Sequence, residues 1–161
     1  MFVAVAMMLA APDIFLKTQV QGWTISKSGL SCRAEKKTDW SKKVAILKAK
    51  DDSASLFLSA TEHGASYFGD FNITQPEQKF DISFYKGFNS GEGWLGHSAQ
   101  AIPSEGGVQI MTTVPFSELA VKVTGAGGIV FSQGKMKTAF FLIEGLPNAL
   151  ALLDECSKTL R

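Results

Sequence analysis

The sequence predicts a mainly β protein, an antiparallel β-sandwich or flattened barrel with a C-terminal α-helix. Two observations favour this class. Short segments of alternating apolar and polar residues recur along the chain, and turns containing glycine or proline separate them. The clearest helical pattern comes only at the end, at residues 147–158. The chain has 161 residues, of which 45% are hydrophobic, so it is long enough for a single domain with a substantial core.

The alternation is clearest at residues 79–85, where Phe80, Ile82 and Phe84 are separated by other residues that would point to the opposite face of a strand. Segments of this kind predict about eight to ten strands, many of them paired as hairpins. The expected strands are residues 22–26, 30–34, 44–49, 54–60, 79–85, 94–102, 108–114, 129–131 and 138–143, with a connector at 12–20 and a loop at 61–78.

The C-terminal helix is predicted to begin near Pro147, because the first turn of a helix tolerates a missing N–H. Leu150 and Leu153 begin its apolar stripe. A second, short helix is expected at residues 115–121, with Ser117 as its cap. The expected core comprises Trp23, Leu56, Leu58, Phe80, Ile82, Phe84, Ile110, Phe140, Leu142, Leu150 and Leu153.

Cys32 and Cys156 are the only cysteines, and they lie near opposite ends of the predicted domain. The chain has no C-x-x-C spacing, which disfavours a thioredoxin-like redox pair. We expect a disulfide that ties the C-terminal helix to the first strands; closing so long a loop stabilises a fold by about 4–5 kcal/mol in the chain-entropy model. Two buried free thiols are one alternative. A zinc site that adds His63 and His97 is another, although none of its spacings is local, as structural zinc sites usually require.

Residues 1–16 are expected to be either a signal-peptide remnant or an N-terminal segment of the mature protein, and residues 17–161 a single β-rich domain. Residues 1–11 are a continuous apolar run that has the length of a signal-peptide core and is too short to span a bilayer, so no transmembrane helix is expected. No Lys or Arg precedes the run, and a strand or helix of the mature fold is the alternative. Together with the cysteines, the run predicts a periplasmic or secreted protein.

No catalytic, cofactor-binding or metal-binding signature is recognised in the sequence, so no catalytic residue and no cofactor are predicted. Residues 91–96 match the dinucleotide pattern G-x-G-x-x-G, but a proline at 103 and the β-rich surroundings disfavour the helix that such a motif requires. A hairpin turn explains these glycines. The alternative to a non-catalytic protein is a hydrolase with a carboxylate or histidine site outside the known motifs. Its candidate acids are Glu62, Asp70, Asp81 and Glu92, and nothing in the sequence pairs any two of them.

Two regions are candidate partner contacts. The first, residues 33–43, places basic residues around a tryptophan, and the second, the loop 61–78, carries three aromatic residues. A formal net charge of only +1 argues against nucleic acid, so the expected partner is an envelope protein, lipid or glycan. The alternatives are a solvated hairpin loop and aromatics that fold inward. The candidate contact residues are Arg33, Lys36, Lys37, Trp40, Lys42, Lys43, Tyr67, Phe68 and Phe71.

The C-terminal sequence, Phe140-Phe-Leu-Ile-Glu-Gly145-Leu-Pro-Asn-Ala149-Leu-Ala-Leu-Leu153-Asp-Glu-Cys156, resembles the closing strand, glycine and helix of small secreted proteobacterial proteins. These include the invasion-associated locus B family and related exported proteins of unknown function. Trp23-Thr-Ile-Ser-Lys, followed by Cys32, is similar to their opening strand. The resemblance covers about a third of the chain and implies a periplasmic β-sandwich without a known catalytic site. The function expected from the sequence is therefore an exported, non-catalytic envelope-associated or binding domain.

Overall fold

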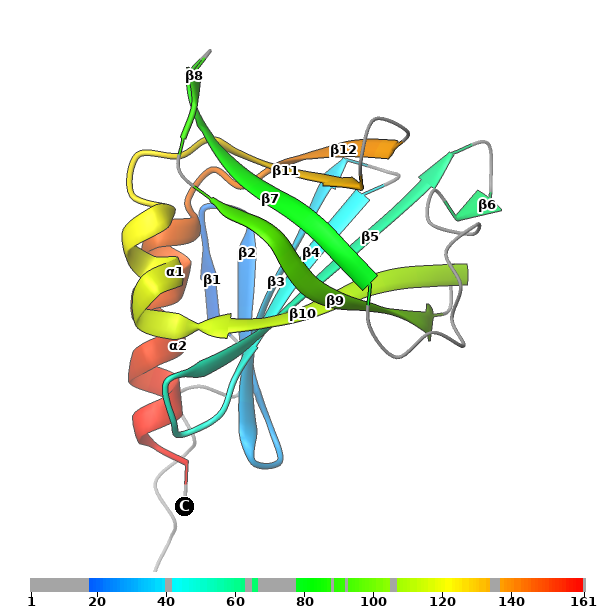
Figure 1. The fold of residues 1–161 in the computed structure, drawn as a ribbon. Coiled ribbons are helices and arrows are strands. Elements are labelled where there is room, and N and C mark those ends of the chain that lie inside the picture. Colours follow the sequence, from blue (N-terminus) through cyan, green and yellow to red (C-terminus); the bar gives the residue numbers. More distant parts are fainter. Residues whose placement is uncertain are drawn as a thin grey trace, which may run out of the picture.

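A computed structural model describes residues 18–39, 42–62, 65–66, 78–87, 89–91, 93–104, 107–133 and 137–160. These residues form a flattened, mainly antiparallel β structure with a C-terminal helix, which confirms the predicted fold class (Figure 1). The strands are β1 (Thr18–Val20), β2 (Trp23–Ser28), β3 (Ser31–Asp39), β4 (Lys42–Lys48), β5 (Ser53–Glu62), β6 (Ala65–Ser66), β7 (Gln78–Lys86), β8 (Asn89–Ser90), β9 (Trp94–Ser104), β10 (Gly107–Pro115), β11 (Gly128–Gln133) and β12 (Lys137–Leu142); the helices are α1 (Phe116–Lys122) and α2 (Leu146–Lys158).

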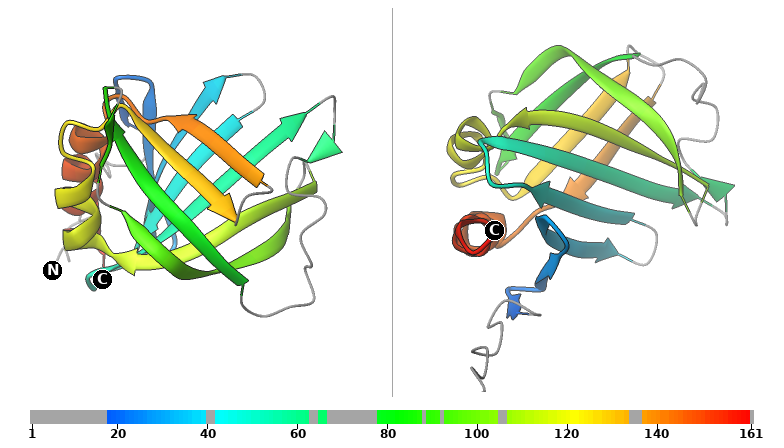
Figure 2. Two further views of the ribbon diagram at one scale, coloured as in Figure 1. Left: turned by 45° about the horizontal axis from the view of Figure 1, so that its top comes forward. Right: turned by 90° about the horizontal axis from the view of Figure 1, so that it is seen from below.

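The hydrogen-bonded strand order is β1-β2-β3-β4-β5-β10-β9-β7-β11-β12, with β6 on β5 and β8 on β7. Strand β9 belongs to two layers, because Gln100–Ser104 pair with β10 while Trp94–Ala99 pair with β7. We call β1–β5 and β10 the first sheet, and β7, β11 and β12 the second sheet, which lies across it (Figure 2). Residues 18–20, expected in a connector, instead form the edge strand β1.

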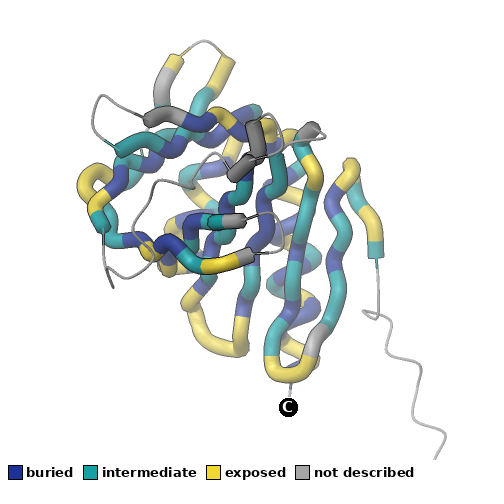
Figure 3. The backbone as a smooth tube through the Cα atoms, turned by 90° about the vertical axis from the view of Figure 1, so that its right-hand side faces the viewer, coloured by how far each residue is buried: buried dark blue, intermediate teal, exposed yellow. Residues whose placement is uncertain are grey.

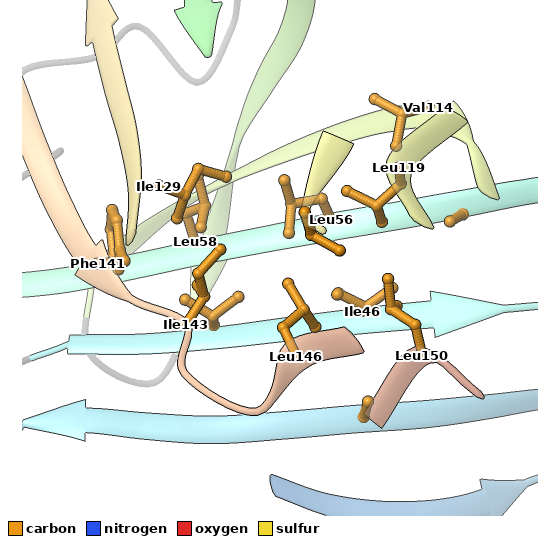
Figure 4. Packing of buried hydrophobic residues seen from close by; sticks show 14 of the residues in the cluster. Ile46, Leu56, Leu58, Val114, Leu119, Ile129, Phe141, Ile143, Leu146 and Leu150 are labelled. Atoms are coloured by element: carbon orange, nitrogen blue, oxygen red, sulfur yellow. The ribbon is translucent and has the colours of Figure 1, made fainter. Parts of the chain in front are cut away.

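The core lies between the two sheets and against α2. Buried and exposed residues alternate along the strands, because successive side chains of a strand point to opposite faces (Figure 3). Figure 4 shows Leu56 and Leu58 of β5 in one packed cluster with Ile129 of β11 and Leu150 of α2. The expected core residues other than the two on β12 are buried.

The predicted face of β12 was wrong. Phe140 and Leu142 are 41% and 46% exposed, whereas Phe141 and Ile143 are completely buried. The four consecutive residues 140–143 are all apolar, so the sequence pattern does not distinguish the two faces of this strand. Pairing with β11 decides the matter, since Phe141 lies opposite the buried Ile129.

Helix α2 begins where predicted, and Gly145 makes its start feasible. Gly145 has a left-handed backbone (φ 80°), and a Cβ at this position would collide with the side chain of Gln21. Helix α2 then packs against β2 and β3. At its far end Cys156 forms the expected disulfide with Cys32, 124 residues away, with a Cα–Cα distance of 6.1 Å. Both sulfurs are used in this disulfide, so neither cysteine is available as the thiolate ligand of the zinc site considered from the sequence.

Helix α1 is also present, but its predicted cap was wrong. Ser117 lies inside the helix, and the residue that caps the helix is Asp52, from the turn between β4 and β5. The Asp52 carboxylate accepts hydrogen bonds from the backbone N–H of Ser117 (2.9 Å) and from its hydroxyl (2.7 Å). The Asp52 carbonyl accepts a third, from the Phe116 N–H. A residue distant in sequence thus satisfies two of the free N–H groups of the first turn, those of Phe116 and Ser117.

Candidate functional site

The basic stretch 33–43 does not form one surface, because successive residues of a strand point to opposite faces. Cys32 and Ala34 are buried on the inner face of β3, so Arg33 and Lys37 lie on its outer face. Lys43 lies on the same outer face of β4, directly opposite Lys37. We call Arg33, Glu35, Lys37 and Lys43 the basic face.

Glu35 lies among the cations of the basic face and accepts contacts from two of them. Arg33 Nε lies 2.8 Å and Lys43 Nζ 3.1 Å from Glu35 Oε2. Partial burial acts to raise the pKa of Glu35, but the hydrogen bonds and charges of Arg33 and Lys43 outweigh it and hold the pKa below its usual value. Lys37 is exposed, and no ion pair links it to another described residue. The basic face therefore keeps a surplus of positive charge, concentrated at Lys37 and Lys43.

Lys36 takes part in the fold rather than in this surface. Its Nζ donates to the carbonyl oxygens of Glu144 (2.9 Å) and Gln21 (3.3 Å). Trp23 Nε1 donates to the same Glu144 oxygen at 2.9 Å. Together these bonds fix the turn between β12 and α2. Lys42 lies on the inner face of β4, in alternation with the outward Lys43, so it is not part of the basic face either.

Several residues predicted from the sequence cannot be placed. Trp40, Tyr67, Phe68 and Phe71, proposed as partner contacts, lie outside the described residues, as does His63. The further candidate acids Asp70 and Glu92 lie outside them as well. The part of the loop 61–78 that is described contains the short pairing of β6 with β5.

His97 lies where β9 leaves β10 to join the second sheet. The backbone pairing of the two strands ends at Met111 and Gln100, and side chains bridge the opening beyond that point. Thr112 Oγ1 donates to the Ser98 carbonyl (2.8 Å), and His97 Nε2 lies 3.0 Å from the Thr113 carbonyl. The histidine thus satisfies a main-chain oxygen that the splitting of the strands leaves unpaired.

A cavity of about 240 Å³ lies at this opening, with Gln100, Met111 and Thr113 among its walls. Its described lining contains no carboxylate. Asp81, a candidate acid from the sequence, instead accepts a hydrogen bond from the Gly96 N–H (2.7 Å) at the irregularity in the β7–β9 pairing. The arrangement can hold a small polar molecule, but it brings no carboxylate of the described residues together with His97.

Trp94 connects helix α1 with the second sheet, a role that the sequence pattern does not reveal. Its ring packs edge-on against Phe84 (centroids 5.7 Å apart) and beside His97 (5.9 Å). Its Nε1 donates to Glu118 of α1 at 2.9 Å, and Lys122 Nζ lies 5.3 Å from the ring centroid. These contacts hold the Trp94 indole between α1 and the second sheet.

Lys48 is only 4% exposed, and the contacts of its ammonium group were not predicted from the sequence. Its Nζ donates to the Asp51 carbonyl (2.9 Å), lies 3.6 Å from Asp154 Oδ1 and sits 4.7 Å from the Phe116 ring centroid. A groove of about 370 Å³ between α1 and α2 is lined by Phe116, Leu150 and Asp154 among others. Lys48 therefore joins the first sheet to both helices at one point.

Gly91 to Gly96, the match to the dinucleotide pattern, leads directly into strand β9 rather than into a helix. Gly93 is needed for close packing, because a Cβ there would overlap the carbonyl of Ile82. Among the described residues no group of three or more His, Cys, Asp and Glu side chains converges as a metal site would. Within the same residues, no helix is both long enough and apolar enough to cross a membrane. No protein-family model, curated protein or solved structure matches this chain.

Proposed function

We propose that this protein is an exported, non-catalytic binding domain of the cell envelope. The observation that carries the proposal is the buried Cys32–Cys156 disulfide, which joins the two ends of the domain. Disulfides of this structural kind persist in oxidising compartments and are rare in reducing ones. The apolar run at residues 1–11 and the resemblance to secreted proteobacterial proteins support the same location.

The basic face is the surface that we propose for binding, and an anionic group of the envelope is its partner. Lys37 and Lys43 stand directly opposite each other on neighbouring strands, an arrangement of like charges that costs stability unless an anion relieves it. Glu35 is already engaged with Arg33 and Lys43, so it does not neutralise Lys37. A lipid headgroup and an acidic polysaccharide both offer the required negative charge.

A hydrolase is the competing hypothesis, and the surroundings of His97 do not favour it. A hydrolytic histidine needs a carboxylate or a nucleophile within hydrogen-bond reach. His97 contacts a main-chain carbonyl and the Trp94 ring instead.

The test compares binding of the intact protein to anionic and neutral vesicles and to an acidic polysaccharide, at several salt concentrations. The variant Lys37→Ala/Lys43→Ala removes two charges, each worth about 1 kcal/mol at an anionic surface, so affinity should fall by about thirtyfold. Lys50→Ala is the matched control. It removes an exposed lysine from the turn between β4 and β5, away from the basic face, and should bind as the wild type does. Binding that is insensitive to salt and to the Lys37→Ala/Lys43→Ala change would refute this use of the basic face. Recovery of the protein from the cytoplasm alone would refute export.

A further inference from the structure

The opening between β9 and β10 places main-chain hydrogen-bonding groups beside a cavity. The regular pairing of the two strands ends before Ser98 and Thr113, which the same register would place opposite each other. Side chains reach the carbonyl oxygens of both residues instead: Thr112 Oγ1 donates to the Ser98 carbonyl (2.8 Å), and His97 Nε2 lies 3.0 Å from the Thr113 carbonyl. The cavity of about 240 Å³ lies at this point, and both Ser98 and Thr113 line it.

This opening offers hydrogen-bond donors rather than acceptors to a ligand. In an extended strand the N–H and C=O of one residue point to the same side, so the N–H groups of Ser98 and Thr113 face the opening as their carbonyls do. The two carbonyls already accept side-chain donors, whereas the two N–H groups lie beyond the end of the regular pairing. A ligand that enters here therefore meets one main-chain donor from each strand.

A cation stands at the rim of the cavity. Lys79 of β7 lies opposite Ser98 of β9, and its Nζ donates to Ser98 Oγ. The Ser98 hydroxyl is left to donate its own hydrogen to a ligand. The described lining contains no carboxylate, and Asp81, two residues further along β7, accepts the Gly96 N–H. No acid of this lining therefore competes with a ligand for these donors.

The far wall of the opening is held in place before any ligand arrives. The His97 ring lies beside the Trp94 ring, with centroids 5.9 Å apart. Trp94 is itself held by the hydrogen bond from its Nε1 to Glu118 of α1. A wall that is fixed in advance lowers the entropy cost of binding.

We propose that this cavity binds a carboxylate group carried on a short aliphatic chain. The carboxylate oxygens accept the N–H groups of Ser98 and Thr113 and so bridge the two strands where their pairing ends. The Ser98 hydroxyl and Lys79 stabilise the negative charge. Ala99 and Met111, which also line the cavity, provide apolar surface for the chain. This site is separate from the basic face, which lies on β3 and β4.

The test titrates the full chain with sodium butyrate at constant ionic strength and follows the backbone amide resonances by NMR. Butyrate should bind saturably in the millimolar range, because so small a ligand makes few contacts. The amide signals of Ser98 and Thr113 should move most. Butyramide has nearly the same shape without the charge and should cause much smaller shifts. Shifts that do not saturate, or equal shifts with butyramide, would overturn the proposal.

Lys79→Ala removes the cation at the rim and should weaken butyrate binding by about tenfold. Lys86→Ala is the matched control, since it removes an exposed lysine from the other end of β7, and should bind butyrate as the wild type does. The variant Lys37→Ala/Lys43→Ala should also keep wild-type affinity for butyrate, which separates this site from the function of the basic face. Equal weakening by Lys79→Ala and Lys86→Ala would overturn the site.

A free acid and the C-terminus of a peptide both present such a carboxylate. N-acetyl-dialanine with a free C-terminus distinguishes them: tighter binding than that of butyrate identifies a chain end, and weaker binding identifies a free acid. The same peptide with an amidated C-terminus lacks the carboxylate and should not bind in either case. Equal binding of the free and amidated peptides would contradict recognition of a carboxylate.

Discussion

The first and second sheets are fixed to the rest of the molecule by different means. The first sheet is joined to α2 by the disulfide between Cys32 and Cys156 and by the contact of Lys48 with Asp154. A third connection runs from Trp23 Nε1 to the Glu144 carbonyl, just before α2. All three link residues that are far apart in the sequence, so the two ends of the domain are held as one unit.

Among the described residues, no disulfide or ion pair links the second sheet to α2, and this sheet depends on packing. Phe80 and Phe131 stack within it (centroids 4.4 Å apart), and Phe84 contacts Trp94. Its outer face keeps Phe140 exposed at the edge. The comparison teaches that specific bonds lock the first sheet to α2, whereas the second sheet is held by packing and keeps large apolar side chains exposed on β12. Reduction of the disulfide and Phe131→Ala each remove a support of one sheet, and the smaller predicted effects concern single contacts at α1 and α2.

Breaking the disulfide should have the largest effect, a loss of about 4–5 kcal/mol in the free energy of unfolding, because the unfolded chain regains the freedom of a very long loop. Reduction of the wild type in denaturant-unfolding experiments measures this loss without changing any side-chain volume. Hydrogen exchange should quicken in α2 and β3 more than in β7 and β11. The variant Cys32→Ala/Cys156→Ala is the control, and its stability should not respond to reductant. Equal free energies of unfolding for the oxidised and reduced wild type would show that the disulfide does not stabilise the fold.

Phe131→Ala tests the packing of the second sheet. The side chain is 1% exposed and stacks on Phe80, so its removal should cost about 3–4 kcal/mol through lost burial and a cavity. The loss should be similar with and without reductant, because the two supports lie in different parts of the fold. Phe140→Ala, on the exposed face of the neighbouring strand, should cost much less. A smaller loss for Phe131→Ala than for Phe140→Ala would contradict the assignment of faces.

The core could be predicted from the sequence wherever apolar and polar residues alternate, as in β5 and β7. It could not be predicted for β12, because both faces of this strand carry apolar residues. Only the pairing with β11 decides which face points inward. The division of the basic stretch follows from the same alternation, so the separation of Lys36 from Lys37 was within reach of the sequence. The bridging role of His97 was not, since it depends on β9 changing partners between two sheets.

Asp52→Ala should cost about 1 kcal/mol, since it removes the side chain that caps α1 from across the fold. Chemical denaturation monitored by circular dichroism measures the change. Ser117→Ala is the matched control: it removes only the hydroxyl bond to Asp52 and keeps the backbone bond, so it should cost less. If Ser117→Ala is the more damaging change, Asp52 is not the cap.

Asp154 should give the smallest effect, seen as a dependence of stability on pH. The hydrogen bond from Lys158 is the main cause that holds the pKa of Asp154 below its usual value, with a further contribution from Lys48. Because the folded pKa is the lower one, the stabilisation is complete above the unfolded value of about 3.9 and is lost as the pH falls through the folded pKa. The Lys158 side chain is 70% exposed, so solvent screens the pair and its contribution near neutral pH is small.

Asp154→Asn removes this dependence. Unfolding free energies of the wild type and the variant, measured from pH 7 down into the acid range, should converge as the pH falls. Glu155→Gln, which changes the neighbouring carboxylate on the same helix, is the control and should leave the wild-type pH profile unchanged. A difference between wild type and Asp154→Asn that grows on acidification would have the wrong sign for a lowered pKa.

The most direct test of the central claim, that a disulfide clasps the two ends of an exported domain, is a thiol count. The protein is taken from its native host without reductant, denatured and titrated with a thiol reagent. The account predicts no free thiol before reduction and two after it, since Cys32 and Cys156 are the only cysteines and they are bonded to each other. Two reactive thiols in the unreduced, denatured protein would contradict the clasp and remove the main argument for export.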